Sequence, residues 1–217
     1  MQLSTMTGML VQGYGVSLQI FFVTLVCASL LGIPVALGRL SRVRPLSAVV
    51  GLYISLMRGT PLMLQMFAVF FAPYYVFGIQ TDSSFMFTAC LIAFVVNYAA
   101  YFAEIYRSGI QSIPRGQYEA AQVLGYTSTQ TFMFIVLPQV IKRILPAMGN
   151  EVIALIKDTS LAFVLGVMEM FTQAKAIAAS QVSMLPYLIA AAIYWCFTLV
   201  VEFILSRIEK KLSYYHD

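Results

Sequence analysis

Long stretches without a charged residue are the feature that most restricts how this chain can fold. Residues 1–38 contain no Asp, Glu, Lys or Arg, and runs of 23, 21 and 26 uncharged residues follow Arg58, Asp82 and Lys175. Roughly 20 mostly apolar residues are enough for a helix to cross a bilayer. Only 10% of the 217 residues are charged and 60% are hydrophobic, which is too few charges to cover the surface of a soluble domain. The sequence therefore predicts an all-α membrane protein surrounded by lipid bilayer.

Five transmembrane helices are expected, within one domain that covers residues 1–217. The stretch from about Ile144 to Phe171 is included although it carries four charges, because the residues between those charges are apolar. A helix of this kind must turn its charges toward protein or water, since charges facing lipid are very costly. We expect the spans at about 14–38, 59–79, 84–106, 144–171 and 183–206.

The basic residues indicate how the helices are oriented, because cytoplasmic loops are enriched in Lys and Arg. They gather after the first span, between the third and fourth, and after the fifth. We therefore expect the N-terminus outside the cell and the C-terminus in the cytoplasm. The neutral start and long apolar stretch favour a retained first helix over a cleavable signal peptide. The basic residues concerned are Arg39, Arg42, Arg44, Arg107, Arg115, Lys142, Arg143, Arg207, Lys210 and Lys211.

Several other functions find no support in the sequence. The net charge of +4 comes from basic residues scattered at the ends of apolar stretches, so no nucleic-acid partner is expected. Cys27, Cys90 and Cys196 lie inside apolar runs without metal-binding spacing, and we expect no metal site and no disulfide framework. The lone histidine, His216, is a tail residue. No P-loop motif is present, and an enzyme activity of this chain is not expected.

A polar loop at about 112–138 falls on the cytoplasmic side of this topology. Gly116–Leu124 is expected to form a short helix that Gly125 ends in the left-handed conformation. A second short helix is expected to begin with a capping hydroxyl at Thr127 or its neighbour and to end before Pro138. Two short helices at an angle would form a compact protrusion.

The same loop has a specific residue spacing: Glu119-Ala120-Ala121, three residues, Gly125, nine residues, Ile135, one residue, then Leu137-Pro138. This spacing resembles the EAA loop of ABC-importer permeases. The resemblance implies that the loop docks into a cleft of a separate ATPase. It assigns ATPase coupling to Glu119, Ala120, Ala121, Gly125 and Pro138.

The resemblance extends over nearly the whole chain to the polar amino acid, or histidine/glutamine-type, branch of these permeases. The matching segments are Met57–Pro61 (MRGTP), Asn97–Glu104 (NYAAYFAE), Gly149–Glu151 (GNE) and Lys157–Leu161 (KDTSL). The family often has Thr-Arg-Gln after the fourth span, whereas this chain has Phe171-Thr172-Gln173 and lacks the arginine. The resemblance implies a type I ABC importer permease-like fold in the bacterial cytoplasmic (inner) membrane.

The resemblance also implies a set of partners and a function. The chain would be the permease subunit of an ATP-driven importer of polar amino acids, without its own cofactor. Two ABC ATPase subunits would bind ATP and Mg. A second permease subunit, identical or related, would complete the path, and an extracytoplasmic binding protein would deliver the substrate.

Seven residues are candidates for the substrate path: Arg58, Thr60, Asn97, Glu151, Lys157, Asp158 and Ser160. Several of them have a structural alternative that the sequence leaves open. Asn97 can join neighbouring helices, Arg58 can mark the cytoplasmic boundary, and Lys157 and Asp158 can pair with other helices. Glu151 and Asp158 are seven residues apart and so share one helix face. A carboxylate in a polar cavity is suited to an ammonium group.

The Glu151 carboxylate favours a basic or amino-bearing substrate such as arginine, lysine, histidine or glutamine, with cystine as a rival. An ion-coupled carrier or a channel subunit is the alternative class of protein. Such a carrier usually has more spans or an inverted repeat, and neither is visible here.

Overall fold

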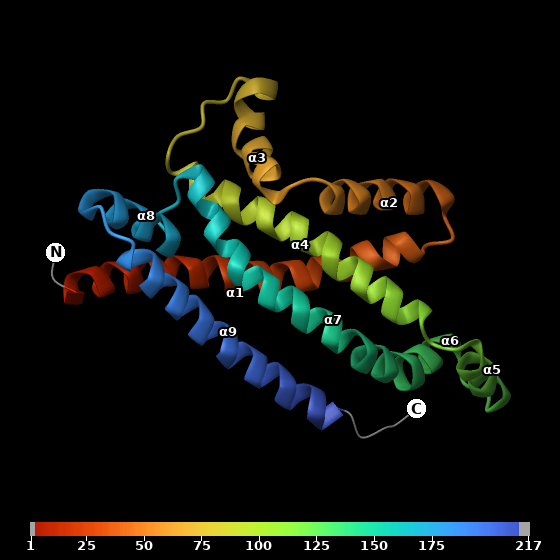
Figure 1. Ribbon diagram of the computed structural model, residues 1–217. Coiled ribbons are helices and arrows are strands. Elements are labelled where there is room, and N and C mark those ends of the chain that lie inside the picture. The colour runs from red at the N-terminus through yellow and green to blue at the C-terminus, as the bar shows by residue number, and fades with distance from the viewer. Residues whose placement is uncertain (1–2, 213–217) are drawn as a thin grey trace.

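The computed structural model describes residues 3–212, and every regular element within them is helical (Figure 1). In chain order these are α1 (Leu3–Leu40), α2 (Arg44–Gly59), α3 (Leu62–Phe77), α4 (Phe85–Gln111), α5 (Arg115–Val123), α6 (Ser128–Gln130), the π-helix η1 (Thr131–Val136), α7 (Leu137–Asp158), the 3₁₀-helix η2 (Thr159–Leu165), α8 (Met170–Gln181) and α9 (Leu185–Leu212).

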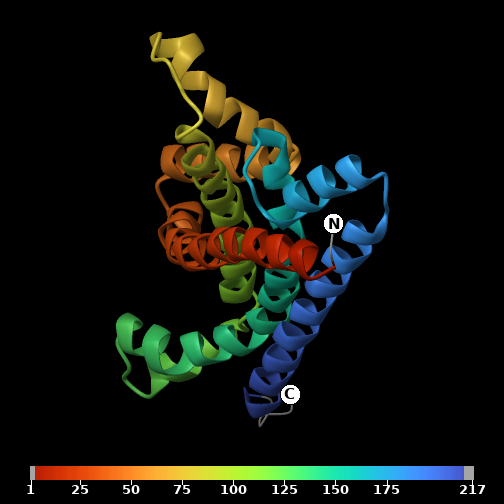
Figure 2. The same cartoon turned by 90° about the vertical axis from the view of Figure 1, so that its left-hand side faces the viewer.

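Four long helices, α1, α4, α7 and α9, form the body of the molecule (Figures 1 and 2). The helix α4 lies at its centre, where it packs along α1 and also touches α2, α3 and α7. Its buried face alternates small and large residues, which lets neighbouring helices approach closely, as is common in membrane bundles. The fully buried residues of this face include Ala89, Cys90, Phe94, Ala100, Phe102 and Ala103.

The predicted all-α membrane fold is confirmed. Within the described part of the chain, four helical stretches are long and apolar enough to span a membrane, and a fifth is added if α2 and α3 together form one bent span. The first turns of α1 lie at the same end of the bundle as α8, whereas α5 and α6 lie at the opposite end (Figure 1). The loop that resembles a coupling element is thus far from the start of the chain.

The region from residue 128 to 171 differs from the expected span at 144–171. One helical stretch, Ser128–Leu165, passes the length and hydropathy test for a membrane span. Pro138 does not end a short second helix there, because α6, η1 and α7 follow one another without a break. Leu137 N–H donates to the carbonyl of Phe132, five residues back, and the Gln139 side chain donates to the Ile135 carbonyl at 2.8 Å. These bonds keep the helix hydrogen-bonded on both sides of Pro138, although the proline itself donates none.

The second expected span, at about 59–79, is also built differently. The helix α3 has only 16 residues, and it follows α2, a helix that the sequence analysis did not predict, at a bend of 112°. Thr60 has extended backbone angles, as a residue before proline prefers, and Pro61 precedes the first turn of α3. Figure 1 shows α3 turning away from the bundle after this bend.

Candidate coupling loop and substrate path

The turn after α5 has the geometry that the sequence predicted for Gly125. Its φ is +79°, in the left-handed region. The N–H of Tyr126 donates to the Ala121 carbonyl at 3.0 Å, and the N–H of Gly125 donates to the Gln122 carbonyl at 3.0 Å. This pair of bonds is a Schellman motif, which satisfies the last carbonyls of the helix and favours glycine at this position.

The two sides of α5 face different surroundings. Ala121 is buried, whereas Glu119, Ala120 and Gly125 are exposed. A small apolar cluster, separate from the main core, lies under this part of the molecule. Its buried members are Ile113, Val136 and Val140. One side of α5 therefore packs near this small cluster, and the opposite side is exposed.

Two large apolar residues extend the exposed surface at the end of α5. Val123 is 89% exposed and Leu124 is 72% exposed. Two adjacent exposed apolar residues at the tip of a protruding helix are available for contact with a partner protein. The sequence analysis did not single them out, because the matched spacing leaves both positions unspecified.

Thr127 starts the next helix, as expected. Its hydroxyl accepts from the N–H of Gln130 at 3.3 Å, and the Gln130 side chain accepts from the N–H of Thr127 at 2.9 Å. This capping box fixes the first turn of α6. Pro138 is exposed and is the second residue of α7, directly after the π-helix η1. The loop is thus a fixed corner between α5 and the long helical stretch that leads to α7.

Asn97, on α4, lies in a hydrogen-bond network that closes the break between α2 and α3. It is 4% exposed. Its side-chain nitrogen donates to the Met57 carbonyl at 2.9 Å and to Oε1 of Gln65 at 2.9 Å. The nitrogen of Gln65 in turn donates to the hydroxyl of Thr60 at 2.8 Å and to the Met57 carbonyl at 3.0 Å. Both Asn97 and Thr60 therefore hold the bent helix pair in place.

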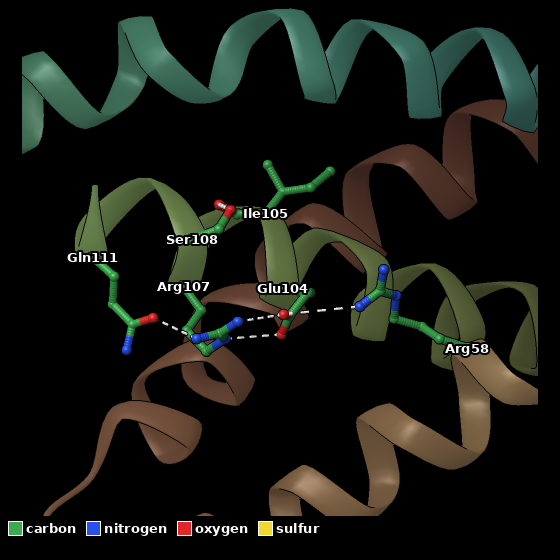
Figure 3. Close-up of polar contacts among 6 residues, drawn as sticks. All are labelled: Arg58, Glu104, Ile105, Arg107, Ser108 and Gln111. Atoms are coloured by element: carbon green, nitrogen blue, oxygen red, sulfur yellow. Dashed lines mark hydrogen bonds and ion pairs between the residues drawn. The ribbon is translucent and has the colours of Figure 1, made fainter. Parts of the chain in front are cut away.

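Arg58, the last charged residue of α2, is placed beside α4 (Figure 3). Its Nη1 lies 3.9 Å from Oε1 of Glu104, and its guanidinium carbon lies 5.4 Å from the centre of the Tyr101 ring. Glu104 is bonded more closely by Arg107, whose Nε is 2.9 Å from Oε2. The Arg58 side chain remains 43% exposed, so its ion pair is weak and the guanidinium can interact with another anion.

The two acids of α7 lie along one side of the helix, as their spacing predicted. Asp158 accepts a hydrogen bond from the hydroxyl of Tyr98 on α4 at 2.7 Å. Glu151 is half-buried, and Arg58 and Asp158 are the charged groups that act on it electrostatically. Within residues 3–212 neither acid forms a salt bridge. Together with Tyr98 and Arg58, the acids form a polar strip between α2, α4 and α7.

Within residues 3–212, no hydrogen bond or ion pair joins Lys157 or Ser160 to the residues of this strip. Lys157 is exposed, and the hydroxyl of Ser160 donates to the backbone carbonyl of Lys157 at 2.7 Å. Three residues that contribute to the polar contacts, Gln65, Tyr98 and Glu104, were not proposed from the sequence as site residues. A glutamine inside an uncharged stretch was the available signal for Gln65, since such a residue needs an internal partner.

Comparison with known proteins finds a matching family and similar proteins over most of the chain. Residues 28–214 match the family described as binding-protein-dependent transport system inner membrane component. The L-cystine transport system permease protein TcyB of Bacillus subtilis is 38% identical over 188 residues, covering 86% of this chain and 79% of that protein. The arginine transport system permease protein ArtQ of the same organism is 36% identical over 205 residues, covering 94% and 92%.

A solved structure agrees with this result. The crystal structure of an amino acid ABC transporter with histidines contains a chain that is 35% identical and superposes with a TM-score of 0.88, covering 96% of each chain.

Proposed function

This chain belongs to the binding-protein-dependent transport system inner membrane components, and we propose that it forms the path of an ATP-driven importer for polar amino acids. It is a multi-pass inner membrane protein and a permease subunit rather than an enzyme. The relatives named for cystine and arginine transport support the substrate class, since each covers most of the chain.

The coupling loop supports the proposal that a separate ATPase drives this permease. The exposed face of α5 carries Glu119 and Ala120, and its end carries Val123 and Leu124. A small, rigid protrusion with an apolar tip is well suited to a cleft in a partner protein. Two ATPase subunits, which would bind the ATP and Mg, would dock on two such loops. One loop would come from this chain and one from a second permease subunit.

The polar strip carries the proposal for the substrate. Glu151 and Asp158 are half-buried acids without a salt bridge in the described part of the chain. A carboxylate in such surroundings gains from a cationic partner. We infer that the ammonium or cationic side chain of an amino acid binds near these acids. Arg58, which is only weakly paired, would hold the carboxylate of the same substrate.

The test is transport by the complete complex in proteoliposomes, with its ATPase and an extracytoplasmic binding protein. Uptake of arginine, glutamine and cystine should be compared for wild type and Glu151→Gln, which keeps the shape and removes the charge. Arginine uptake should fall more than glutamine uptake. Glu202→Gln, at an exposed acid of α9, is the matched control and should transport like wild type. If Glu151→Gln transports every substrate at the wild-type rate, Glu151 is not part of the substrate path.

The same preparation separates an ATP-driven importer from an ion-coupled carrier or a channel. Uptake should stop without ATP, and an ATPase subunit should copurify with the permease. Uptake that follows an ion gradient in the absence of ATP would contradict the proposed energy source.

A further inference from the structure

Glu169 is a buried acid that the substrate path does not use. It follows η2 and directly precedes α8, and it is 0% exposed. Within residues 3–212 it forms no salt bridge. A buried carboxylate is strongly unfavourable unless other groups satisfy it. The sequence analysis placed Glu169 inside a long span, whereas the structure places it at a break between two helices.

The first turn of α8 supplies the closest partners of this carboxylate. The backbone N–H of Phe171 donates to Oε2 at 2.7 Å, and the N–H of Thr172 donates to Oε1 at 2.6 Å. The hydroxyl of Thr172 lies 2.9 Å from Oε1. Glu169 is therefore the N-cap of α8, where the helix dipole also favours a negative charge. This arrangement explains how the acid remains buried without a cation.

Two other helices reach the same carboxylate. The hydroxyl of Ser17 on α1 and the hydroxyl of Tyr194 on α9 each lie 3.3 Å from Oε2. Ser17 also accepts from the N–H of Met170 at 3.3 Å. An acid that needed only a helix cap would not require donors from α1 and α9. The carboxylate therefore joins three helices at one point.

Gly13 allows α1 to pack closely against the first turn of α8 at this junction. A Cβ atom at this position would lie 2.9 Å from the Cα of Met170 and 3.0 Å from the carbonyl carbon of Glu169. Both are backbone atoms, which cannot move aside without shifting α8. The first turn of α8 is thus seated directly on α1, one turn before Ser17.

The junction also reaches the segment that follows the path acid Asp158. The hydroxyl of Tyr194 lies 3.4 Å from that of Thr159. Tyr194 has a single proton, which the Glu169 carboxylate accepts, and Thr159 donates its own hydroxyl proton to the Ile156 carbonyl at 2.8 Å. The Tyr194 and Thr159 hydroxyls are therefore in contact without a hydrogen bond between them. Thr159 is 1% exposed and is the first residue of η2, next to Asp158.

We propose that Glu169 is a positioning residue that seats α8 on α1 and α9 and, through Tyr194, holds the backbone that carries Asp158. In this arrangement the contacts of Glu169 and Tyr194 join α1, α8 and α9 to the start of η2. The position of the Asp158 carboxylate then depends on a contact at the end of the bundle opposite the coupling loop. The effect on substrate affinity rests on the proposed role of Asp158, whereas the seating of α8 does not.

The seating of α8 is tested by thermal unfolding of the purified permease. Gly13→Ala should lower the Tm by about 5 °C, because the added methyl group overlaps backbone atoms. Gly15→Ala is the matched control, since a Cβ at that position of the same helix meets nothing within 4 Å. It should not lower the Tm. Equal Tm values for Gly13→Ala and Gly15→Ala would overturn the seating of α8.

The link to Asp158 is tested by transport kinetics in proteoliposomes with arginine. Tyr194→Phe removes the hydroxyl that bonds Glu169 and contacts Thr159. It keeps the ring and leaves the backbone cap of α8 in place. It should raise the KM for uptake by about fivefold, the effect of losing one hydrogen bond. Tyr187→Phe is the control on the same helix, because the Tyr187 hydroxyl has no hydrogen bond within the described residues. An unchanged KM for Tyr194→Phe would refute the link.

Asp158→Asn distinguishes failure of this inference from failure of the proposed function. If Asp158→Asn raises the KM and Tyr194→Phe does not, the path assignment stands and the link is wrong. If neither variant changes the KM, Asp158 lies outside the path and the link has no transport role. The Tm comparison decides the seating of α8 in both cases.

Discussion

Removing the amide of Asn97 should loosen the bent pair of helices α2 and α3. Asn97→Asp has nearly the same shape but replaces the donating NH₂ group with an oxygen. That oxygen would face the Met57 carbonyl and Oε1 of Gln65, which the NH₂ group now contacts at 2.9 Å each. Rotating the Gln65 amide would offer it a donor, but only by giving up the bonds from Gln65 to Thr60 and Met57.

The expected loss of stability follows from these contacts. Two hydrogen bonds at about 1 kcal/mol each, together with the acceptors left unsatisfied in a buried site, amount to about 2–4 kcal/mol. Interhelical hydrogen bonds measured in membrane proteins average about 0.6 kcal/mol, which sets a lower limit of about 1 kcal/mol for the pair. Asn97→Leu, which removes both donors without adding a charge, should lose a similar amount.

Equilibrium unfolding of the purified protein in mixed micelles, followed by circular dichroism, measures this free energy of unfolding. Asn150→Asp is the control, because Asn150 is exposed on α7. It makes the same chemical change outside the network. If Asn97→Asp and Asn97→Leu both unfold within about 0.5 kcal/mol of the control, the range of ordinary surface substitutions, the network does not hold the bend.

Three further predictions concern the coupling loop, the packing of α4 and the orientation in the membrane. Gly125→Val should sharply reduce transport while membrane insertion persists, because a left-handed residue with a branched side chain costs roughly 1–2 kcal/mol. Gly116→Val, at a helical position of the same loop, is the control. Normal uptake with Gly125→Val would contradict the coupling role. Gly109→Ala should lower the free energy of unfolding by about 1–3 kcal/mol, since a Cβ there would lie 2.2 Å from a side chain of α7. An unchanged unfolding curve would argue against this close contact. A cysteine placed at Gln80 should react with an impermeant thiol reagent from outside, and one at Gln117 only after permeabilisation; the opposite labelling pattern would reverse the orientation inferred from the basic residues.

The helices that cross the membrane could be predicted because their signal is local. An uncharged apolar stretch of about 20 residues has few alternatives to a membrane helix. The corner at Gly125 was predictable for a similar reason, since the residue types of a helix end are specified within a few positions. The structure bears out its left-handed φ of +79°.

The errors came where the chain departs from a straight helix. Pro138 is a reasonable stop signal in isolation, yet a π-helical turn and the Gln139 side chain let the helix continue past it. The helix α2 was missed because its 16 residues include two arginines and a proline, and it depends on α3 to form a span. Periodicity and composition do not report such compensating contacts.

The sequence by itself determined that this protein is a helical membrane protein, because hydropathy carries that information, and the residue spacing at 112–138 showed its resemblance to ABC-importer permeases. It also placed Glu151 and Asp158 on one side of α7, which follows from the helical repeat. Only the tertiary structure decided that Asn97 joins α4 to the α2–α3 bend and that Glu169 is a shared cap at the junction of α1, α8 and α9. Both roles depend on groups 25 to 152 residues apart along the chain, and contacts over such separations are set by packing rather than by local sequence.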